Sequence, residues 1–416
     1  LVVHDFKRAL MWLNEGGWPL PSYNFYIRPS FEEVMDVLGM LLQKANQGPL
    51  RISSDIETRS NLIACHGIAW SNLDAICIPW LCIERPLGYW TLDQEVAIWE
   101  REKKLMTHEN IEIVGQNYLY DAQYFARRRG YVPRIKHDTM FKQHVAWAGM
   151  AKGLDFLSSM YCKYHVYWKD EGKEWNAKLP EDQLWSYNCK DAVTTFESDT
   201  ELTKILEHLH LTEQYNIQMK VWQYALKMMF RGVKVDQLLR GKIAAELLSA
   251  MMTREQEIEA ILGHPFNIRS PKQVHGLFYG QLKCKVVKSK ATHKPSCDDN
   301  ALRTFAEREP LLKPLTERIA DLRSSNAIKA PIDPDGRIRS SFDPTAETYR
   351  WKSYENAFGT GTNLQNWTKG NEEEEDRKEH RADLPNVRKT LVPDLGYELA
   401  SIDLSGADAQ TVAWEA

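Results

Sequence analysis

The sequence lacks several features that mark familiar protein classes. It has no apolar run long enough to cross a bilayer, and its start lacks the charged-then-apolar layout of a secretory signal. Its seven cysteines are scattered and form no C-x-x-C pair, so neither a disulfide framework nor a zinc site is indicated. We therefore expect no membrane partner and a reducing cytoplasmic location.

A strong charge bias and internal repeats are also missing. The formal net charge is −4, with 26% charged and 43% hydrophobic residues, which is ordinary for a globular protein. A nucleic-acid partner must therefore be argued from local patches and not from the total charge. The 416 residues allow roughly two to four domains at about 100–200 residues each.

The first half of the chain mixes strand and helix patterns. A serine N-cap, early glutamates and Gly48 predict an amphipathic helix over 30–48. Three β-rich runs predict an antiparallel meander at 50–57, 62–70 and 75–80. Further segments are expected as a helix at 93–107, a strand at 111–116, and helices at 118–130, 138–150, 153–163 and 181–209. This order predicts a mixed α/β domain over 22–209, after an N-terminal extension of residues 1–21.

The second half is dominated by long helical patterns. They cover 215–232, 238–263, a helix that starts at Pro271, and 298–325. A loop-like basic stretch lies between the helix that starts at Pro271 and the helical pattern at 298–325. It contains Lys283, Lys285, Lys288, Lys290 and Lys294. Such a loop can grip phosphates without reading sequence, although a solvated lysine-rich loop is the simpler alternative.

Acidic residues recur in three short clusters of the first half. Asp55 and Glu57 lie two apart on a predicted strand, so they face the same side, although a solvated strand end would show the same pattern. Asn117 is placed to cap the next helix, with Asp121 in its first turns. Tyr187 and Asp191, four apart, share one helix face, as an ordinary surface pair also would.

Taken together, the three clusters predict a metal site. Four carboxylates from separate elements can converge on two divalent cations about 3.5–4 Å apart, the arrangement used for in-line phosphodiester hydrolysis. Tyr187 is then placed to orient the attacking water. Hard oxygen ligands favour Mg²⁺ or Mn²⁺ over zinc.

The segments "SDIET", "GQNYLYD" and "YNCKD" resemble, in order, the three motifs of the DEDDy-type 3′–5′ exonucleases. The resemblance implies an RNase H-like fold and a proofreading type of activity. It also implies that Asp55, Glu57, Asp121 and Asp191 bind two metal ions, with Tyr187 as a further catalytic residue. Asn117, inside the second motif, is expected to contact DNA.

Later segments resemble the family A DNA polymerases, the class of bacterial DNA polymerase I and many phage replicases. They are "RGVKVD" (231–236), "FNIRSPKQVHGLFY" (266–279), "GRIRSSFDPTAETYRWKS" (336–353), "GTNLQNW" (361–367) and "RKTLVPDLGYELASIDLSGADAQ" (388–410). The expected fold is α/β: an exonuclease domain, a mostly helical thumb over 210–332, and the beginning of an α+β palm over 333–416. A bacterial or phage-infected cell is the implied setting.

The same resemblance assigns roles in the palm. Asp403, after the predicted strand "ELASI", matches the first polymerase metal ligand, although a strand-end aspartate is the plain alternative. Asp408 stands where the family has a glutamate that helps exclude ribonucleotides, and its shorter side chain puts sugar discrimination in doubt. The positions that match residues near the primer and template are Arg350, Asn363, Gln365 and Asn366; a turn-rich polar loop is their alternative.

Two parts of the polymerase pattern have no match in the sequence. These are the nucleotide-binding finger helix and the later H-D-E segment, which supplies the second metal carboxylate. One carboxylate cannot hold a two-metal site, so we expect no polymerisation by this chain alone. A truncated sequence, or a split polymerase whose remainder is supplied by a second polypeptide, would explain this pattern. We expect dNTP to bind only if the palm and fingers are completed. The expected partner is DNA, as primer–template duplex and as single-stranded 3′ end.

Two other functions stay open at this point. One is a stand-alone exonuclease acting on DNA or on RNA, as ribonuclease D does. The other is a non-catalytic DNA-binding or assembly subunit.

Overall fold

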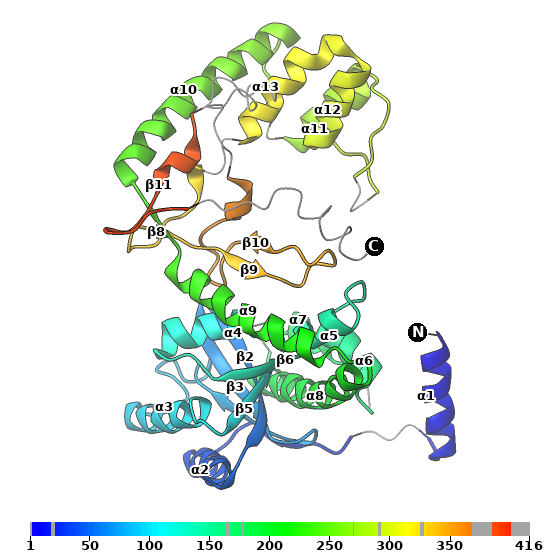
Figure 1. Cartoon of the computed structure of the whole chain (residues 1–416), viewed down its shortest axis with the longest axis vertical. Coiled ribbons are helices and arrows are strands. Elements are labelled where there is room, and N and C mark those ends of the chain that lie inside the picture. The colour runs from blue at the N-terminus through cyan, green and yellow to red at the C-terminus, as the bar shows by residue number, and fades with distance from the viewer. Residues whose placement is uncertain are drawn as a thin grey trace. The chain divides into compact units, whose positions relative to one another are not determined.

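The computed structural model describes residues 2–17, 21–163, 167–176, 179–268, 270–289, 293–324, 328–367 and 385–400 (Figure 1). The chain divides into two compact units. The first comprises Leu1–Phe230 and Phe342–Lys352, and the second comprises Arg231–Ser341 and Ser353–Ala416. Among these described ranges, no helix is long and apolar enough to cross a membrane.

A six-stranded mixed sheet organises the first unit, in the order β1-β4-β3-β2-β5-β6. Its strands are β1 (Asn24–Tyr26), β2 (Leu50–Arg59), β3 (Leu62–Ala69), β4 (Asp74–Pro79), β5 (Ile111–Gly115) and β6 (Ile135–Asp138). β2, β3 and β4 pair antiparallel, which confirms the predicted meander, whereas β5 runs parallel to both β2 and β6. The short β1 and β6 were not predicted.

Helices cover both faces of this sheet (Figure 1). The helices in this part of the chain are α1 (Val2–Asn14), α2 (Phe31–Gln47), α3 (Leu92–Met106), α4 (Leu119–Tyr124), α5 (Thr139–Ala146), α6 (Leu154–Tyr161), α7 (Lys169–Glu174), α8 (Glu181–His208) and α9 (Thr212–Arg231). The predicted start of α2 is confirmed, because Ser30 and Glu33 form a capping box. Successive residues of β2 face opposite sides, so Ser53 contacts α8 while Ser54 points toward the side covered by α3.

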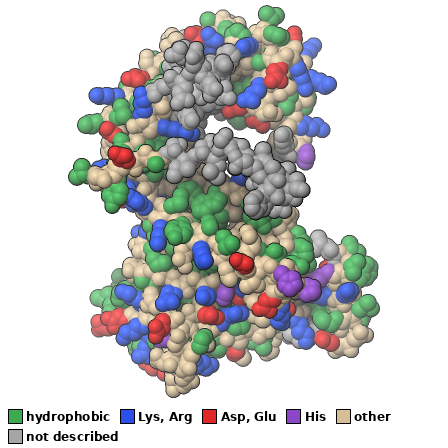
Figure 2. All heavy atoms as spheres, in the orientation of Figure 1, with side chains coloured by type: hydrophobic (Ala, Val, Ile, Leu, Met, Phe, Trp, Pro, Cys, Tyr) green, Lys and Arg blue, Asp and Glu red, His purple; other side chains and the backbone are tan. Residues whose placement is uncertain are grey.

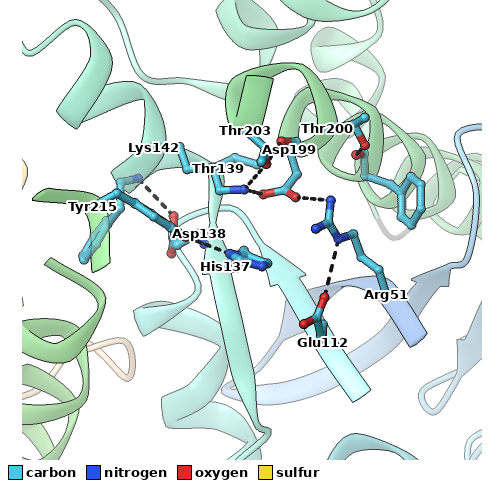
Figure 3. Close-up of polar contacts among 12 residues, drawn as sticks. Arg51, Glu112, His137, Asp138, Thr139, Lys142, Asp199, Thr200, Thr203 and Tyr215 are labelled. Atoms are coloured by element: carbon cyan, nitrogen blue, oxygen red, sulfur yellow. Dashed lines mark hydrogen bonds and ion pairs between the residues drawn. The ribbon is translucent and has the colours of Figure 1, made fainter. Parts of the chain in front are cut away.

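A buried ion cluster joins strand β2 to helices α5 and α8 (Figure 3). The Lys142 ammonium lies 2.5 Å from one oxygen of Asp199, and the Arg51 guanidinium lies 3.2 Å from the other. Asp199 is fully buried and Lys142 is 1% exposed. Tyr215 of α9 accepts the backbone N–H of Asp138 at 3.1 Å, so α9 is fastened to the same region. Loss of one buried charge would leave its partner uncompensated.

The second unit begins with a helical subdomain. Its helices are α10 (Gln237–Leu262), α11 (Pro271–His275) with a following π-helical turn, α12 (Asp299–Arg308) and α13 (Lys313–Ser324). The rings of Phe278 and Phe305 stack in its core at 4.8 Å between centroids. The single helix predicted over 298–325 is wrong, because Pro310 starts a 3₁₀ turn that separates α12 from α13. Proline lacks the N–H that a continuous helix needs there.

Small sheets lie in the rest of the chain. β7 (Val233–Val235) lies between β8 (Arg337–Ile338) and β11 (Leu391–Val392) in the second unit. β9 (Ser341–Asp343) pairs with β10 (Lys352–Tyr354), and these strands hold the two ends of the segment Phe342–Lys352, which groups with the first unit. The predicted strand at 398–402 is wrong for its described part, since 398–400 form no strand. In the described part of the chain no strand pairs with it, and an unpaired segment gains no ladder hydrogen bonds.

Candidate metal centre

Strand β2 presents two carboxylates on the face that α8 covers. Ser53 donates from its hydroxyl to the Ala192 carbonyl at 2.6 Å. The Asn188 amide donates to the Asp55 carboxylate at 2.8 Å and to its carbonyl at 3.2 Å. Asp55 and Glu57 therefore stand beside α8, half-buried, as their spacing of two predicts.

The carboxylate of Asp191 reaches the same place from α8. One ligand oxygen from each of Asp55, Glu57 and Asp191 lies within 4.8 Å of the other two. Asp121 of α4 is 5% exposed, and its Oδ1 accepts the backbone N–H of Ile56 at 3.0 Å, between the two acids of β2. The structure thus brings three of the four predicted acids within ligand distance of one another and places the fourth, Asp121, against the strand that carries two of them.

The acids of the site are buried and repel one another, and a bound cation would offset this repulsion. Burial raises the pKa of Asp55 to about 8, with further repulsion from Asp191. Burial and the charge of Asp55 raise the pKa of both Glu57 and Asp121 well above their usual range. Buried, mutually repelling carboxylates at this spacing are a hard-oxygen donor set, which fits a divalent metal ion.

Tyr187 lies one helical turn before Asp191. Burial, followed by the charge of Asp191, raises the pKa of its phenol well above the usual value. The hydroxyl therefore stays protonated and serves as a hydrogen-bonding group.

The predicted role of Asn117 as a helix cap is wrong. Tyr118 occupies the N-cap position of α4, and Asn117 takes a left-handed φ of 55°. Asparagine tolerates this conformation because its short polar side chain bonds locally. The buried carboxylate of Asp138 holds the turn instead, since it accepts the N–H of Asn117 at 3.1 Å and of Tyr118 at 2.8 Å.

A second buried network supports the site from the opposite face of β2. The Ser54 hydroxyl lies 2.8 Å from both His66 Nε2 and the Tyr118 hydroxyl. His66 Nδ1 lies 2.6 Å from the Glu102 carboxylate, which accepts the Tyr131 hydroxyl at 3.0 Å. The neighbour of Asp55 and the turn before Asp121 are thereby bonded to each other. Sequence reasoning missed this network, because its members are scattered from 54 to 131.

Short helix α7 adds two side chains that were not predicted. The Trp168 indole donates to Oδ1 of Asp191 at 2.5 Å. The Lys169 ammonium donates to Oδ2 of Asp191 at 2.5 Å and to the Tyr187 hydroxyl oxygen at 3.0 Å. No local pattern in the sequence marks these residues as part of the site.

Apart from Asn117, the residues predicted to bind DNA lie in the second unit or in the segment 342–352. Lys283, Lys285, Lys288 and Lys294 are exposed, and the Tyr279 hydroxyl anchors their loop by donating to the Val287 carbonyl at 3.2 Å. On the face in Figure 2, basic side chains are interspersed with acidic ones.

The positions predicted to lie near the primer and template differ in exposure and in hydrogen bonding. Arg350 and Gln365 are exposed, while Asn363 Oδ1 accepts the Ser353 hydroxyl at 2.6 Å and the Gln365 N–H at 3.0 Å. Asn363 is thus a turn-stabilising residue as well. Asn366 lies in a 3₁₀ turn with its side chain outside the description. Lys290, Asp403 and Asp408 lie outside the described residues, as does the acidic run 371–376.

Comparisons with known proteins place this carboxylate-bearing α/β domain in the 3′–5′ exonuclease class. A family model for the 3′–5′ exonuclease matches residues 85–207, and one for DNA polymerase family A matches residues 239–413. The chain thus carries, in this order, a segment similar to the 3′–5′ exonuclease model and a segment similar to the family A DNA polymerase model. Because the second match covers the helical half, the alternative of a stand-alone exonuclease is set aside.

Relatives agree with these two matches. DNA polymerase I of Borreliella burgdorferi is 26% identical over 246 residues, which is 57% of this chain and 27% of that protein. DNA polymerase I of Pseudomonas aeruginosa is 25% identical over 340 residues, covering 77% of this chain and 35% of the relative. DNA polymerase DpoZ of Vibrio phage phiVC8 is 26% identical over 156 residues, or 36% and 24% of the two chains. The chain thus spans only a minor part of each relative.

The fold is shared with a solved structure. The POL domain of Pol1 from M. smegmatis, in complex with DNA primer-template and dNTP, superposes with a TM-score of 0.59 at 17% identity. The match covers 90% of this chain and 59% of that one. At this identity the similarity concerns the fold.

Proposed function

We propose that the first unit is a metal-dependent 3′–5′ exonuclease that removes nucleotides from single-stranded or frayed 3′ ends of DNA. The observation that carries the proposal is the meeting of Asp55, Glu57 and Asp191 oxygens within 4.8 Å, with Asp121 bonded alongside. A mismatched terminus unpairs at lower cost, so it reaches such a site more often. The activity is therefore proofreading.

The proposed metal ligands are Asp55, Glu57, Asp121 and Asp191. Two Mg²⁺ ions, or Mn²⁺ in their place, would supply Lewis-acid activation of a water and stabilise the leaving oxygen. Tyr187, held protonated, hydrogen-bonds the attacking water and fixes its direction. Asn188 and the Ile56 N–H hold Asp55 and Asp121 in their ligating orientation.

For the rest of the chain we propose a DNA-binding role. The helical region, 210–332, would act as the thumb, with its basic loop (Lys283, Lys285, Lys288, Lys290, Lys294) on backbone phosphates. The region 333–416 would be part of the palm, where Arg350, Asn363, Gln365 and Asn366 approach the primer–template. This assignment is supported by the fold shared with a polymerase domain solved with DNA primer-template and dNTP.

Polymerisation is proposed only for a completed palm and fingers, whether from a longer chain or from a second polypeptide. In that assembly Asp403 would be the first metal ligand and Asp408 would stand at the sugar-discrimination position. Seven free cysteines support the cytoplasm as the location, since none is paired.

Degradation of 5′-labelled single-stranded DNA in Mg²⁺ tests the exonuclease. The double variant Asp55→Ala, Glu57→Ala should lose more than about 100-fold in rate, because metal ligands matter at least as much as their supporting partners. Glu100→Ala, an exposed change on α3, is the matched control. A parent protein with no 3′ degradation would overturn the proposal and favour the non-catalytic subunit. A matched RNA oligonucleotide tests the sugar preference.

A further inference from the structure

Helix α7 is fastened to α8 by contacts that do not involve the carboxylates. The Lys190 ammonium lies 2.7 and 2.8 Å from the two oxygens of Glu171. Gln183 donates to the Glu171 carbonyl at 3.0 Å, and the Trp175 indole donates to the Pro180 carbonyl at 3.0 Å. The position of α7 beside the metal centre is therefore set by the packing of these two helices.

Close packing also fits α7 to the tyrosine of the site. A Cβ on Gly172 would lie 2.6 Å from Cζ of the Tyr187 ring, which no side chain could occupy without displacing that ring. Trp168 is buried with Leu154, Leu157 and Leu202, and Tyr187 packs against this cluster. The Tyr187 ring is thus confined on the α7 side.

Lys169 projects from this helix onto Tyr187 and Asp191. Its ammonium donates to the Tyr187 hydroxyl oxygen and to Oδ2 of Asp191, and it lies 4.9 Å from the Tyr187 ring centroid. An ammonium group has donors and no acceptor. Tyr187 therefore accepts from Lys169, and its own proton is directed to another partner.

The charge of Lys169 acts on the acidic site as a whole. It lowers the pKa of Asp55, Glu57 and Asp191, opposing the effect of burial on each. Four carboxylates and two divalent ions balance each other without it. The extra positive charge is then available to offset the phosphodiester of the bound 3′ end, and it opposes the binding of another cation at Asp191.

We propose that Lys169 is a positioning residue of the exonuclease, an inference that rests on the proposed function. It fixes the hydroxyl of Tyr187 and the carboxylate of Asp191, and it supplies a monovalent charge for the substrate phosphate at the expense of metal affinity. Removal of this charge should therefore lower kcat and raise the affinity for Mn²⁺.

The test compares Lys169→Met and Lys169→Arg with the parent protein. Lys169→Met should lower kcat on a single-stranded DNA oligonucleotide by about 10–100-fold, the range seen when supporting partners of metal ligands are lost. KM should rise, by less than about threefold, because a charge that offsets the substrate phosphate is lost. The same variant, free of DNA, should bind Mn²⁺ about threefold more tightly or better in a calorimetric titration, because a like charge is gone. Lys169→Arg should restore most of both values.

The control is Lys204→Met, an exposed lysine of α8 that pairs with Glu201 and should change neither quantity. Loosening of the fold would weaken Mn²⁺ binding and kcat together, and that result would overturn the proposal, as would no change in either. An inactive parent would sink the proposed function separately. If the parent is inactive and Lys169→Met binds Mn²⁺ as the parent does, the proposal that Lys169 lowers metal affinity is wrong as well.

Discussion

The two units of this chain handle charge in opposite ways. In the first unit the candidate metal ligands are buried or half-buried, and Asp55, Asp121 and Asp191 accept hydrogen bonds from other elements. In the second unit the candidate DNA contacts are exposed lysines on a loop. Buried charges fix geometry for chemistry, whereas exposed charges attract a polyanion without demanding precise placement.

The largest expected effect is loss of a metal ligand. Asp191→Asn should lower 3′ degradation more than about 100-fold, while duplex DNA binding in a gel-shift assay stays within twofold. Glu207→Gln, an exposed change on the same helix, is the control. A parallel loss of duplex binding would contradict the assignment of degradation to the first unit and of duplex binding to the second.

Next comes the buried ion cluster. Lys142→Met leaves Asp199 with only Arg51, and breaking such a buried pair costs about 3–5 kcal/mol. Urea unfolding should show this loss in the transition of the first unit, with little change in that of the second. An equal shift in both transitions would contradict the division into separate units.

A smaller effect concerns pH. Burial lowers the pKa of His137 to about 3, below the usual value of 6.5, so the folded state excludes a proton that the unfolded state binds. The stability contribution of His137 is therefore complete above pH 6.5 and is lost as the pH falls toward 3. His137→Gln should flatten this slope relative to the parent in melting curves from pH 7 to pH 4. The pKa of Asp138, raised by burial to about 6, contributes in the opposite sense in both proteins.

The smallest effect is expected from the exposed loop. The triple change of Lys283, Lys285 and Lys288 to alanine should weaken duplex binding and reduce the slope of log affinity against log salt by about 3, roughly one per phosphate contact. Degradation of short single strands should stay unchanged. Lys242→Ala, an exposed lysine of α10, controls for net charge. An unchanged salt slope would indicate that this loop is solvated and does not contact DNA phosphates.

Local spacing was enough to predict much of the first unit. A period of two placed Asp55 and Glu57 on one face of β2, a period of four placed Tyr187 and Asp191 on one face of α8, and Ser30 marked the start of α2. These features depend on backbone geometry that neighbouring residues determine, so the sequence shows them directly.

The rest depends on contacts between distant residues. Asp138 lies 21 residues beyond Asn117, yet it holds the turn that Asn117 was predicted to cap. Lys169 reaches Asp191 across 22 residues from a six-residue helix with no clear periodicity. Such pairings follow from how the elements pack, which spacing within one element does not encode. The roles of Asp403 and Asp408 remain predictions.

The place of β2 inside the sheet has a mechanical consequence. It is bonded to β3 on one edge and to β5 on the other, so it cannot slide without breaking two ladders at once. A slip of one residue would turn both acids away from α8 and bring Ile56 into their place. The two ladders therefore fix the alignment of this strand, so an insertion or deletion within β2 would disturb the acids more than a change of length in the adjoining loops.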